Sequence, residues 1–291
     1  MSNAELPWED VLFKVFGRET KVISSRSIGG GSYNGAEFLD TDIGSFLVKT
    51  NFKTAPDIFE KEASGLDWLG RNGALKVPKV YGHGIMEGLQ YLVMEWIPSG
   101  SPGKNYWEDL GRGLAGLHRT SAKQFGFVED NYISILPQHN PERGQWVDFF
   151  IEERLERMLA LASSRGLLEE NFLKKFRKIY PRLPSWFPEE SPALLHGDLW
   201  SGNVLVTEEG SPSLIDPAVY FGHREMDLAF SRLFGGFSGR FYSAYQEIFP
   251  LAPDFESRKD LYNLYPLLVH LILFGRSYFA SIENVIKKYG D

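Results

Sequence analysis

The order of apolar and polar residues changes character near residue 98. Before that point, residues 35–50 contain two β-compatible runs joined by a turn at Thr41–Gly44, which predicts a β-hairpin. Residues 56–69 change to a helical period, and a third extended run covers residues 89–97. A linker rich in Pro, Gly and Ser follows this run. The first part of the chain is therefore predicted to form a small sheet with one main helix.

The pattern beyond the linker is mostly helical. Apolar stripes of helical period begin at Trp107 and at Trp146. Residues 194–219 return to extended character, and residues 226–289 are helical again. The second part of the chain is therefore predicted to be a larger, mainly helical body with one extended segment.

These elements predict an α+β fold with two lobes. Residues 1–97 would form the smaller lobe, a small antiparallel sheet with one main helix. Residues 98–291 would form the larger, mostly helical lobe. The hinge between the two would lie at residues 94–98, where the third extended run meets a proline.

Composition and charge exclude several classes of protein. The 291 residues contain no cysteine, which excludes disulfides, thiolate metal sites and thiol catalysis. The net charge is −7 without a long Lys/Arg run, so nucleic acid and anionic membranes are not expected partners. The N-terminus has no signal-peptide pattern, and no run reaches the ~18 apolar residues that span a bilayer. The nearest run, Leu267–Phe274, is interrupted by His270. We expect a cytoplasmic protein, either a monomer or a weak dimer.

The segment from His196 to Asn203 (HGDLWSGN) carries the most informative chemistry. It matches the kinase catalytic-loop pattern H-x-D-L-x-x-x-N at all four fixed positions, and an Asp follows at 216 after a hairpin. Phosphoryl transfer from ATP needs a carboxylate that orients the attacking hydroxyl and oxygen ligands that hold Mg²⁺. In this interpretation Asp198 is the catalytic base, and Asn203 and Asp216 are the metal ligands. The alternative is a Gly-Asp turn between two buried strands, with His196 as a core histidine.

The residues after Asp216 differ from those of protein kinases. Pro217 and Ala218 stand where a protein kinase carries Phe and Gly. Proline fixes φ and removes an N–H group, so a mobile activation segment is not expected. This favours an enzyme that is active without phosphorylation.

A lysine and a glutamate near the N-terminus fit the nucleotide side of the same reaction. Lys49 ends the second strand of the hairpin, from which it can reach the α- and β-phosphates. Glu62 lies within the apolar stripe of the 56–69 helix, whereas Glu60 points away. A carboxylate that faces the core needs a partner, and Lys49 is the predicted one. The alternatives are an exposed strand lysine and a glutamate at the edge of the stripe.

Two backbone segments complete the predicted nucleotide site. The glycine-rich stretch Ser27–Asn34 places Gly30, Gly31 and Ser32 where the backbone can approach phosphates closely, although a plain hairpin turn has the same pattern. It is not the G-x-x-x-x-G-K-[ST] loop of Walker-type NTPases. At the predicted hinge, backbone groups of Glu95, Trp96 and Ile97 would read the edge of adenine.

Together these residues resemble the fructosamine (ketosamine) 3-kinase family, relatives of the aminoglycoside and choline kinases with a protein-kinase-like fold. The resemblance covers nearly the whole chain. Its most specific parts are His196–Asn203, Asp216-Pro-Ala218, Tyr220-x-Gly-His-Arg-Glu225 and Leu233-Phe-Gly-Gly-Phe237. Further support comes from Gly29-Gly-Gly-Ser-Tyr-Asn34, Phe59-x-x-Glu62-Ala63-x-Gly65-Leu66, Leu92-Val-Met-Glu95, Leu114-Ala-x-Leu-His118 and Trp146-x-x-Phe-Phe150-x-x-x-Arg154.

The resemblance implies ATP-dependent phosphorylation of the O3 hydroxyl of a ketosamine of the ribulosamine, erythrulosamine or fructosamine type. The 3-phosphate sheds its sugar, so the expected role is deglycation of a small glycated amine or a glycated protein. Asp198 would accept the O3 proton. Lys49, with Mg²⁺ on Asn203 and Asp216, would neutralise the triphosphate. Some family members carry a redox-active cysteine in the glycine-rich loop; Ser32 stands there in this chain, so that control is absent.

The acceptor side is less defined by the sequence. Trp200 would form an apolar platform for the sugar ring or anchor the loop, and His223 would face the cleft. Trp146 is interpreted as helix core, and Arg224 and Asp227 as structural residues that brace the catalytic loop. The alternatives to a ketosamine kinase are a kinase of another small hydroxyl compound, such as an aminoglycoside or choline, and a non-catalytic nucleotide-binding module.

Overall fold

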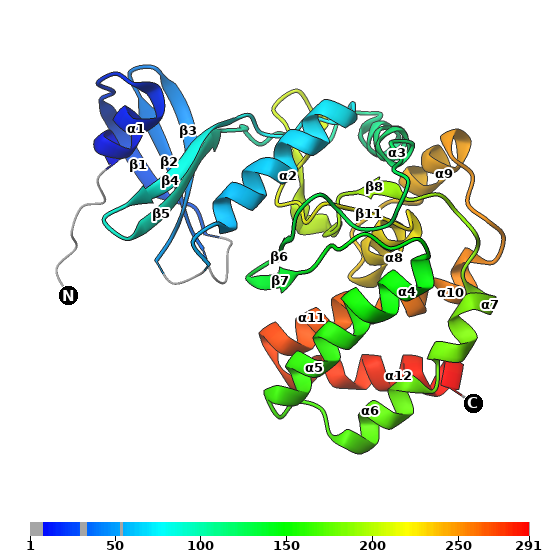
Figure 1. Cartoon of the computed structure of the whole chain (residues 1–291). Coiled ribbons are helices and arrows are strands. Elements are labelled where there is room, and N and C mark those ends of the chain that lie inside the picture. The colour runs from blue at the N-terminus through cyan, green and yellow to red at the C-terminus, as the bar shows by residue number, and fades with distance from the viewer. Residues whose placement is uncertain (1–7, 30–33, 53–54, 291) are drawn as a thin grey trace.

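The fold has two lobes, as the sequence predicts (Figure 1). The structure, a computed structural model, describes residues 8–29, 34–52 and 55–290. The sheet and α1 lie at one end of the molecule and the helical lobe lies at the other, with the long helix α2 between them (Figure 1). Gly30, Gly31 and Ser32 lie outside the described residues, so their predicted role stays a prediction.

The smaller lobe is a five-stranded antiparallel sheet in the order β1-β2-β3-β5-β4. Its elements are α1 (Trp8–Phe16), β1 (Val22–Ser27), β2 (Gly35–Thr41), β3 (Gly44–Asn51), α2 (Ile58–Asn72), β4 (Val80–Met86) and β5 (Leu89–Glu95). The predicted hairpin is confirmed as β2 and β3. The predicted helix begins at Ile58 and extends three residues further than expected, and the third strand ends two residues earlier, at Glu95.

Both faces of this sheet are covered, each by one helix. On one face, Val11 and Leu12 of α1 pack against apolar residues of β2, β3 and β5. On the other face, the apolar stripe of α2 packs against Leu92 and Met94 of β5. The inner strand β5 is therefore buried along almost its whole length, because neither face of it meets solvent.

The segment after β5 is bonded to the larger lobe. The N–H of Gly100 donates to Val206 O at 3.1 Å and that of Gly103 to Gly210 O at 2.9 Å. A Cβ atom on Gly100 would lie 2.4 Å from Thr207 O, so a side chain at that position would clash with backbone. The linker is thus fixed against one hairpin of the larger lobe. The predicted boundary at 97/98 falls within this connection.

The larger lobe consists of helices around short two-stranded sheets. Its elements are α3 (Tyr106–His118), β6 (Asn131–Ile133), β7 (Leu136–Gln138), α4 (Trp146–Phe149), a π-helical segment (Phe150–Glu156), α5 (Arg157–Ser164), α6 (Glu170–Arg177), a 3₁₀ turn (Tyr180–Arg182), α7 (Leu183–Trp186), β8 (Ala193–Leu195), a 3₁₀ turn (Ser201–Asn203), β9 (Val204–Val206), β10 (Pro212–Leu214), β11 (Tyr220–Gly222), α8 (Glu225–Leu233), α9 (Gly239–Ile248), α10 (Phe255–Tyr262), α11 (Leu264–Phe274), a 3₁₀ turn (Arg276–Tyr278) and α12 (Phe279–Gly290). One large apolar core joins these helices. Within the described ranges, no helix has the length and apolarity needed to cross a membrane.

Candidate active site

The His196–Asn203 loop runs between β8 and β9, and a buried histidine holds its start. His196 is fully buried. Its Nε2–H donates to Ile215 O at 2.9 Å, and its Nδ1 accepts from the N–H of Asp198 at 3.2 Å. Burial lowers the pKa of His196, which keeps the ring neutral and suits this pattern of one donor and one acceptor. His196 therefore ties the Asp198 loop to the strand that leads to Asp216.

Asp227 of α8 also holds this loop, through hydrogen bonds to its backbone. Its carboxylate accepts from the backbone N–H groups of His196 at 2.7 Å and Gly197 at 2.9 Å, and it contacts Nε2 of His118 at 3.1 Å. The bracing role predicted for Asp227 is confirmed. Gly197 has a φ of +82°, and a Cβ atom there would lie 2.0 Å from Ala218 O. The loop conformation therefore requires glycine at this position.

Asn203 fixes the side chain of Asp198. Its amide nitrogen donates to Asp198 Oδ2 and to Asp198 O, both at 2.8 Å. Burial raises the pKa of Asp198 to about 7 against this hydrogen bond, and the negative charges of Asp216 and Asp227 add to the rise. A carboxylate with that pKa can take a proton from a hydroxyl near neutral pH, as a general base must.

The raised pKa of Asp198 predicts the pH dependence of the reaction. A general base must be ionised, so Asp198 in its predicted role would make kcat/KM for the acceptor fall tenfold per pH unit below about pH 7. Burial lowers the pKa of His196 and of His270, which moves the titration of both rings away from that of Asp198. Initial rates between pH 5.5 and 9 would measure this fall in kcat/KM. A flat profile from pH 5.5 to 7.5 would contradict the assignment of Asp198 as the base.

Lys49 of β3 connects α2 with the segment that carries Asp216. Its Nζ lies 2.6 Å from Glu62 Oε1 on α2 and 2.5 Å from Asp216 Oδ1, so the predicted pairing with Glu62 is confirmed. Burial acts to lower the pKa of Lys49, but the charges of Asp216 and Glu62 outweigh it and the net pKa is raised. The ammonium group therefore stays charged, and two of its three donors are engaged.

Asp216 has an unusual backbone that the next residue helps to hold. Its φ is +55°, in the left-handed region that Asp tolerates better than most residues. Pro217 packs against α2, where a Cβ atom on Gly65 would lie 3.2 Å from the proline ring. Pro217, which stands where a protein kinase has Phe, thus packs on α2 and helps to hold Asp216 next to Lys49.

The predicted hinge residues lie at the end of β5. The N–H of Glu95 already donates to Lys79 O at 2.8 Å, and its side chain pairs with Lys76 at 2.9 Å. Ile97 is buried. The ring of Trp96 contacts Phe38 with centroids 4.7 Å apart, and Arg26 lies over both rings. Contacts of adenine with the carbonyl of Glu95 and the N–H of Ile97 therefore stay a prediction. The sequence did not indicate the contacts that Arg26 and Phe38 make with Trp96.

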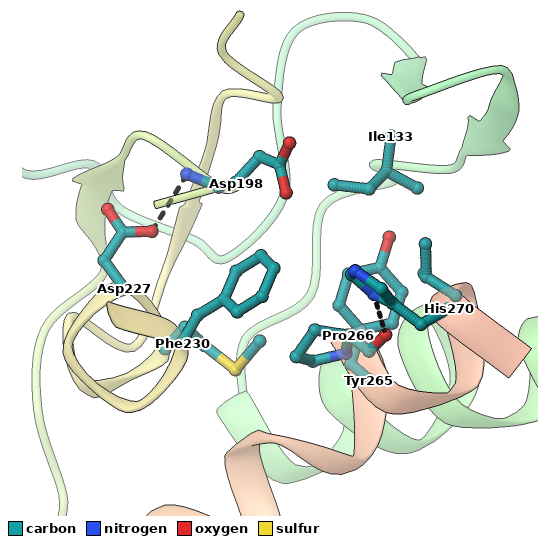
Figure 2. A pocket seen from close by; sticks show the side chains of 10 residues that line it. Ile133, Asp198, Asp227, Phe230, Tyr265, Pro266 and His270 are labelled. Atoms are coloured by element: carbon teal, nitrogen blue, oxygen red, sulfur yellow. Dashed lines mark hydrogen bonds between the residues drawn. The ribbon is translucent and has the colours of Figure 1, made fainter. Parts of the chain in front are cut away.

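A small cavity opens beside Asp198 (Figure 2). The carboxylate of Asp198 points into it, with Ile133 and His270 across from it and Phe230 below. Its lining residues come from β6, the Asp198 loop, α8 and α11: Ile133, Gly197, Asp198, Met226, Asp227, Phe230, Tyr265, Pro266, Val269 and His270. Apart from Asp198 and the bracing Asp227, none of these was a predicted site residue.

The two predicted substrate contacts, Trp200 and His223, lie in different environments. Trp200 is 40% exposed, and its ring lies over Gly202, where a Cβ atom would come within 2.2 Å of it. His223 is 1% exposed, stacks on Trp146 at 4.9 Å and bonds to Tyr262 OH at 2.8 Å. The expectation that His223 faces the cleft is therefore wrong, because its ring belongs to the core around Trp146. Burial lowers the pKa of His223 to about 3.

Comparison with known proteins identifies the family. The family model described as fructosamine kinase matches residues 7–290. The chain belongs to the fructosamine kinase family. Among its relatives, a protein named as a probable ketoamine kinase from Synechocystis is 37% identical and covers 98% of each chain. A chloroplastic protein-ribulosamine 3-kinase from Oryza sativa subsp. indica is 39% identical over 94% of this chain and 80% of that protein.

Solved structures confirm the family's fold for this chain. A crystal structure assigned as a fructosamine-3-kinase from Thermobifida fusca has a TM-score of 0.87 at 34% identity, covering 97% of both chains. A spectinomycin phosphotransferase, at 15% identity and a TM-score of 0.58, shares the fold alone. The predicted protein-kinase-like α+β fold of this fructosamine kinase family member is confirmed.

Proposed function

We propose that the protein is an ATP-dependent kinase that phosphorylates the O3 hydroxyl of ketosamines and so promotes deglycation. The observation that carries the proposal is the carboxylate of Asp198, which has a pKa near 7, is held by Asn203 and points into a cavity. Asp216 and Lys49 on the nucleotide side complete the groups that phosphoryl transfer needs. The names of the relatives support a ketosamine as the acceptor.

Asp198 would accept the O3 proton while the O3 oxygen bonds to the γ-phosphorus of ATP and the bond to the ADP oxygen breaks. Lys49 would use its third donor on a phosphate oxygen, and Glu62 would keep it in place. The product is a ketosamine 3-phosphate. Enolisation of the C2 carbonyl toward C1 would let the C3–O bond break with loss of phosphate. Hydrolysis of the resulting imine at C1 would then release the amine and a dicarbonyl sugar.

The donor groups of Asn203 and Asp216 fit a magnesium ion. The amide nitrogen of Asn203 is used on Asp198, which leaves its oxygen as the ligand atom, and Asp216 adds a carboxylate. Mg²⁺ is commonly held by one or two protein groups plus substrate phosphates and water. The described part of the chain has no group of three or more His, Cys, Asp or Glu residues that could hold a metal by themselves. The ion would neutralise charge on the phosphates.

A panel of acceptors tests the proposed function. ADP release should be measured with ribulosamine, erythrulosamine, fructosamine, an aminoglycoside and choline at equal concentration. We expect turnover with at least one ketosamine and a kcat/KM at least ~10²-fold lower with the aminoglycoside and choline, a difference of about 2.7 kcal/mol or more. Turnover confined to an aminoglycoside or to choline would contradict the proposal and support the alternative kinase class.

Replacing Glu62 tests the nucleotide half. In Glu62→Gln the partner of Lys49 loses its charge, so the lysine is held less firmly and we expect KM for ATP to rise roughly tenfold. Glu60→Gln on the same helix is the matched control, because Glu60 is exposed. Steady-state kinetics at saturating acceptor would measure both. Equal values of KM for ATP in the two variants would exclude a role for Glu62 in nucleotide binding.

A further inference from the structure

A cluster of aromatic rings continues from the Asp198 cavity to the surface. We call it the His270 cluster, and its members are Phe230, Phe234, His270, Phe274 and Tyr278. The ring of His270 lies 4.8 Å from that of Phe234, 5.4 Å from that of Phe274 and 5.1 Å from that of Tyr278, measured between centroids. Phe230 and His270 line the cavity itself. The cluster therefore forms one aromatic surface that begins beside the catalytic base.

The outer part of this surface is open to solvent. Phe234 at the end of α8 is 42% exposed, and Phe274 at the end of α11 is 48% exposed. Exposed aromatic residues that continue a cavity are typical of a binding surface, because exposing such area costs stability without a packing benefit. The rings of Phe234 and Phe274 both contact His270, so they extend the aromatic surface outward from a residue that lines the cavity.

His270 presents a hydrogen-bond acceptor to the cavity. Its Nδ1–H donates to Pro266 O at 2.8 Å within α11 (Figure 2), which leaves the lone pair on Nε2. Burial lowers the pKa of His270 against this hydrogen bond, so the ring is neutral at pH 7. Nε2 can therefore accept from an N–H group, and a cationic donor is not repelled.

The charges around the cavity favour a cation over an anion. Among the described residues that line it, none is Lys or Arg, whereas two are Asp. Asp227 uses both carboxylate oxygens on backbone N–H groups, so Asp198 is the carboxylate available to a bound group. Aromatic faces carry negative electrostatic potential and attract ammonium groups. The cavity and the His270 cluster therefore both favour a cationic group.

We propose that the His270 cluster binds the amine end of the acceptor, with a secondary alkylammonium against the faces of Phe234 and Phe274 and one of its N–H groups donating to Nε2 of His270. This inference rests on the proposed function. In a ketosamine the amine nitrogen is four bonds from O3, so an acceptor with O3 at Asp198 must place its amine within or at the mouth of the same cavity. His270, the cluster member at the centre of these ring contacts, lies across the cavity from Asp198 (Figure 2).

The test compares a charged acceptor with a neutral one of the same shape. We would measure KM for an N-alkyl ketosamine and for the matching 1-O-alkyl ketose ether, using the wild type, Phe234→Leu and Phe274→Leu. Leucine keeps apolar bulk but removes the ring, so the lost interaction is that between the ring and the cation. We expect KM for the ketosamine to rise about 3- to 10-fold more than KM for the ether. Phe13→Leu, at a 52% exposed position on α1, is the matched control and should leave this ratio unchanged.

Each outcome separates this inference from the function on which it rests. A selective rise for the ketosamine in either variant supports the aromatic site. An equal rise for both acceptors, or no rise in either variant, overturns it, because the rings would then recognise no charge. A wild type that phosphorylates no ketosamine overturns the proposed function itself. KM for ATP and the thermal midpoint, measured for every variant, show whether the fold is retained.

Discussion

Asp198→Asn is expected to lower kcat by at least ~10²-fold while the affinity for ATP is retained. The amide can still accept the hydrogen bond that Asn203 gives to Oδ2, so the loop keeps its shape, but it cannot take a proton. The nucleotide groups, Lys49 and Asp216, are unchanged. Turnover by ADP release and ATP binding by calorimetry would measure the two effects separately.

The control for this variant is Asp67→Asn, which makes the same change at a half-exposed aspartate on α2. It should keep wild-type kcat. Because burial disfavours the ionised form of Asp198, the amide should not lower the thermal midpoint at pH 8. Near-normal turnover of Asp198→Asn would show that another group is the base.

Arg258→Met is expected to cost about 3–5 kcal/mol of unfolding free energy. Arg258 on α10 makes a two-point contact with the carboxylate of Glu225, which is 0% exposed at the start of α8, with Nε to Oε2 at 2.7 Å. Removing the guanidinium leaves a buried carboxylate without its charge partner. The same helix carries Asp227, so the Asp198 loop depends on this contact indirectly.

Urea denaturation would measure the loss against a surface pair. Arg112→Met breaks the exposed pair with Glu247 and should cost at most about 1 kcal/mol. The double variant Glu225→Gln/Arg258→Met should regain part of the lost stability, because no buried charge remains. Equal stability of Arg258→Met and Arg112→Met would mean that the Glu225–Arg258 contact contributes little.

The sequence predicted those parts of the site whose residues are close together in the chain or follow a helical apolar pattern. Asp198 and Asn203 lie five positions apart in one loop, so their contact follows from local geometry. The contact between Lys49 and Glu62 follows from the position of Glu62 within an apolar stripe, since a buried carboxylate needs a partner. The contact of Asp216 with Lys49, across 167 positions, was not predicted, because the sequence indicated Asp216 only as a metal ligand.

The cavity beside Asp198 could not be predicted, because its lining is assembled from β6, the Asp198 loop, α8 and α11, which are separate in the sequence. His270 offered one signal: it is a polar residue within the apolar run Leu267–Phe274, and the structure places it at the cavity. The error at His223 has the opposite cause. The charged residues next to it, Arg224 and Glu225, are paired within the larger lobe, and His223 itself packs on Trp146. The elements α1, β1 and β4 were also not predicted.

The most direct test of the central claim is the position of the phosphate in the product. We would incubate the enzyme, ATP and Mg²⁺ with a ketosamine labelled with ¹³C at C3, and follow the reaction by ³¹P and ¹³C NMR. The account predicts a phosphorus coupled to C3, followed by free phosphate and free amine, and neither signal with Asp198→Asn. A phosphate on any other carbon, or on the amine, would contradict it.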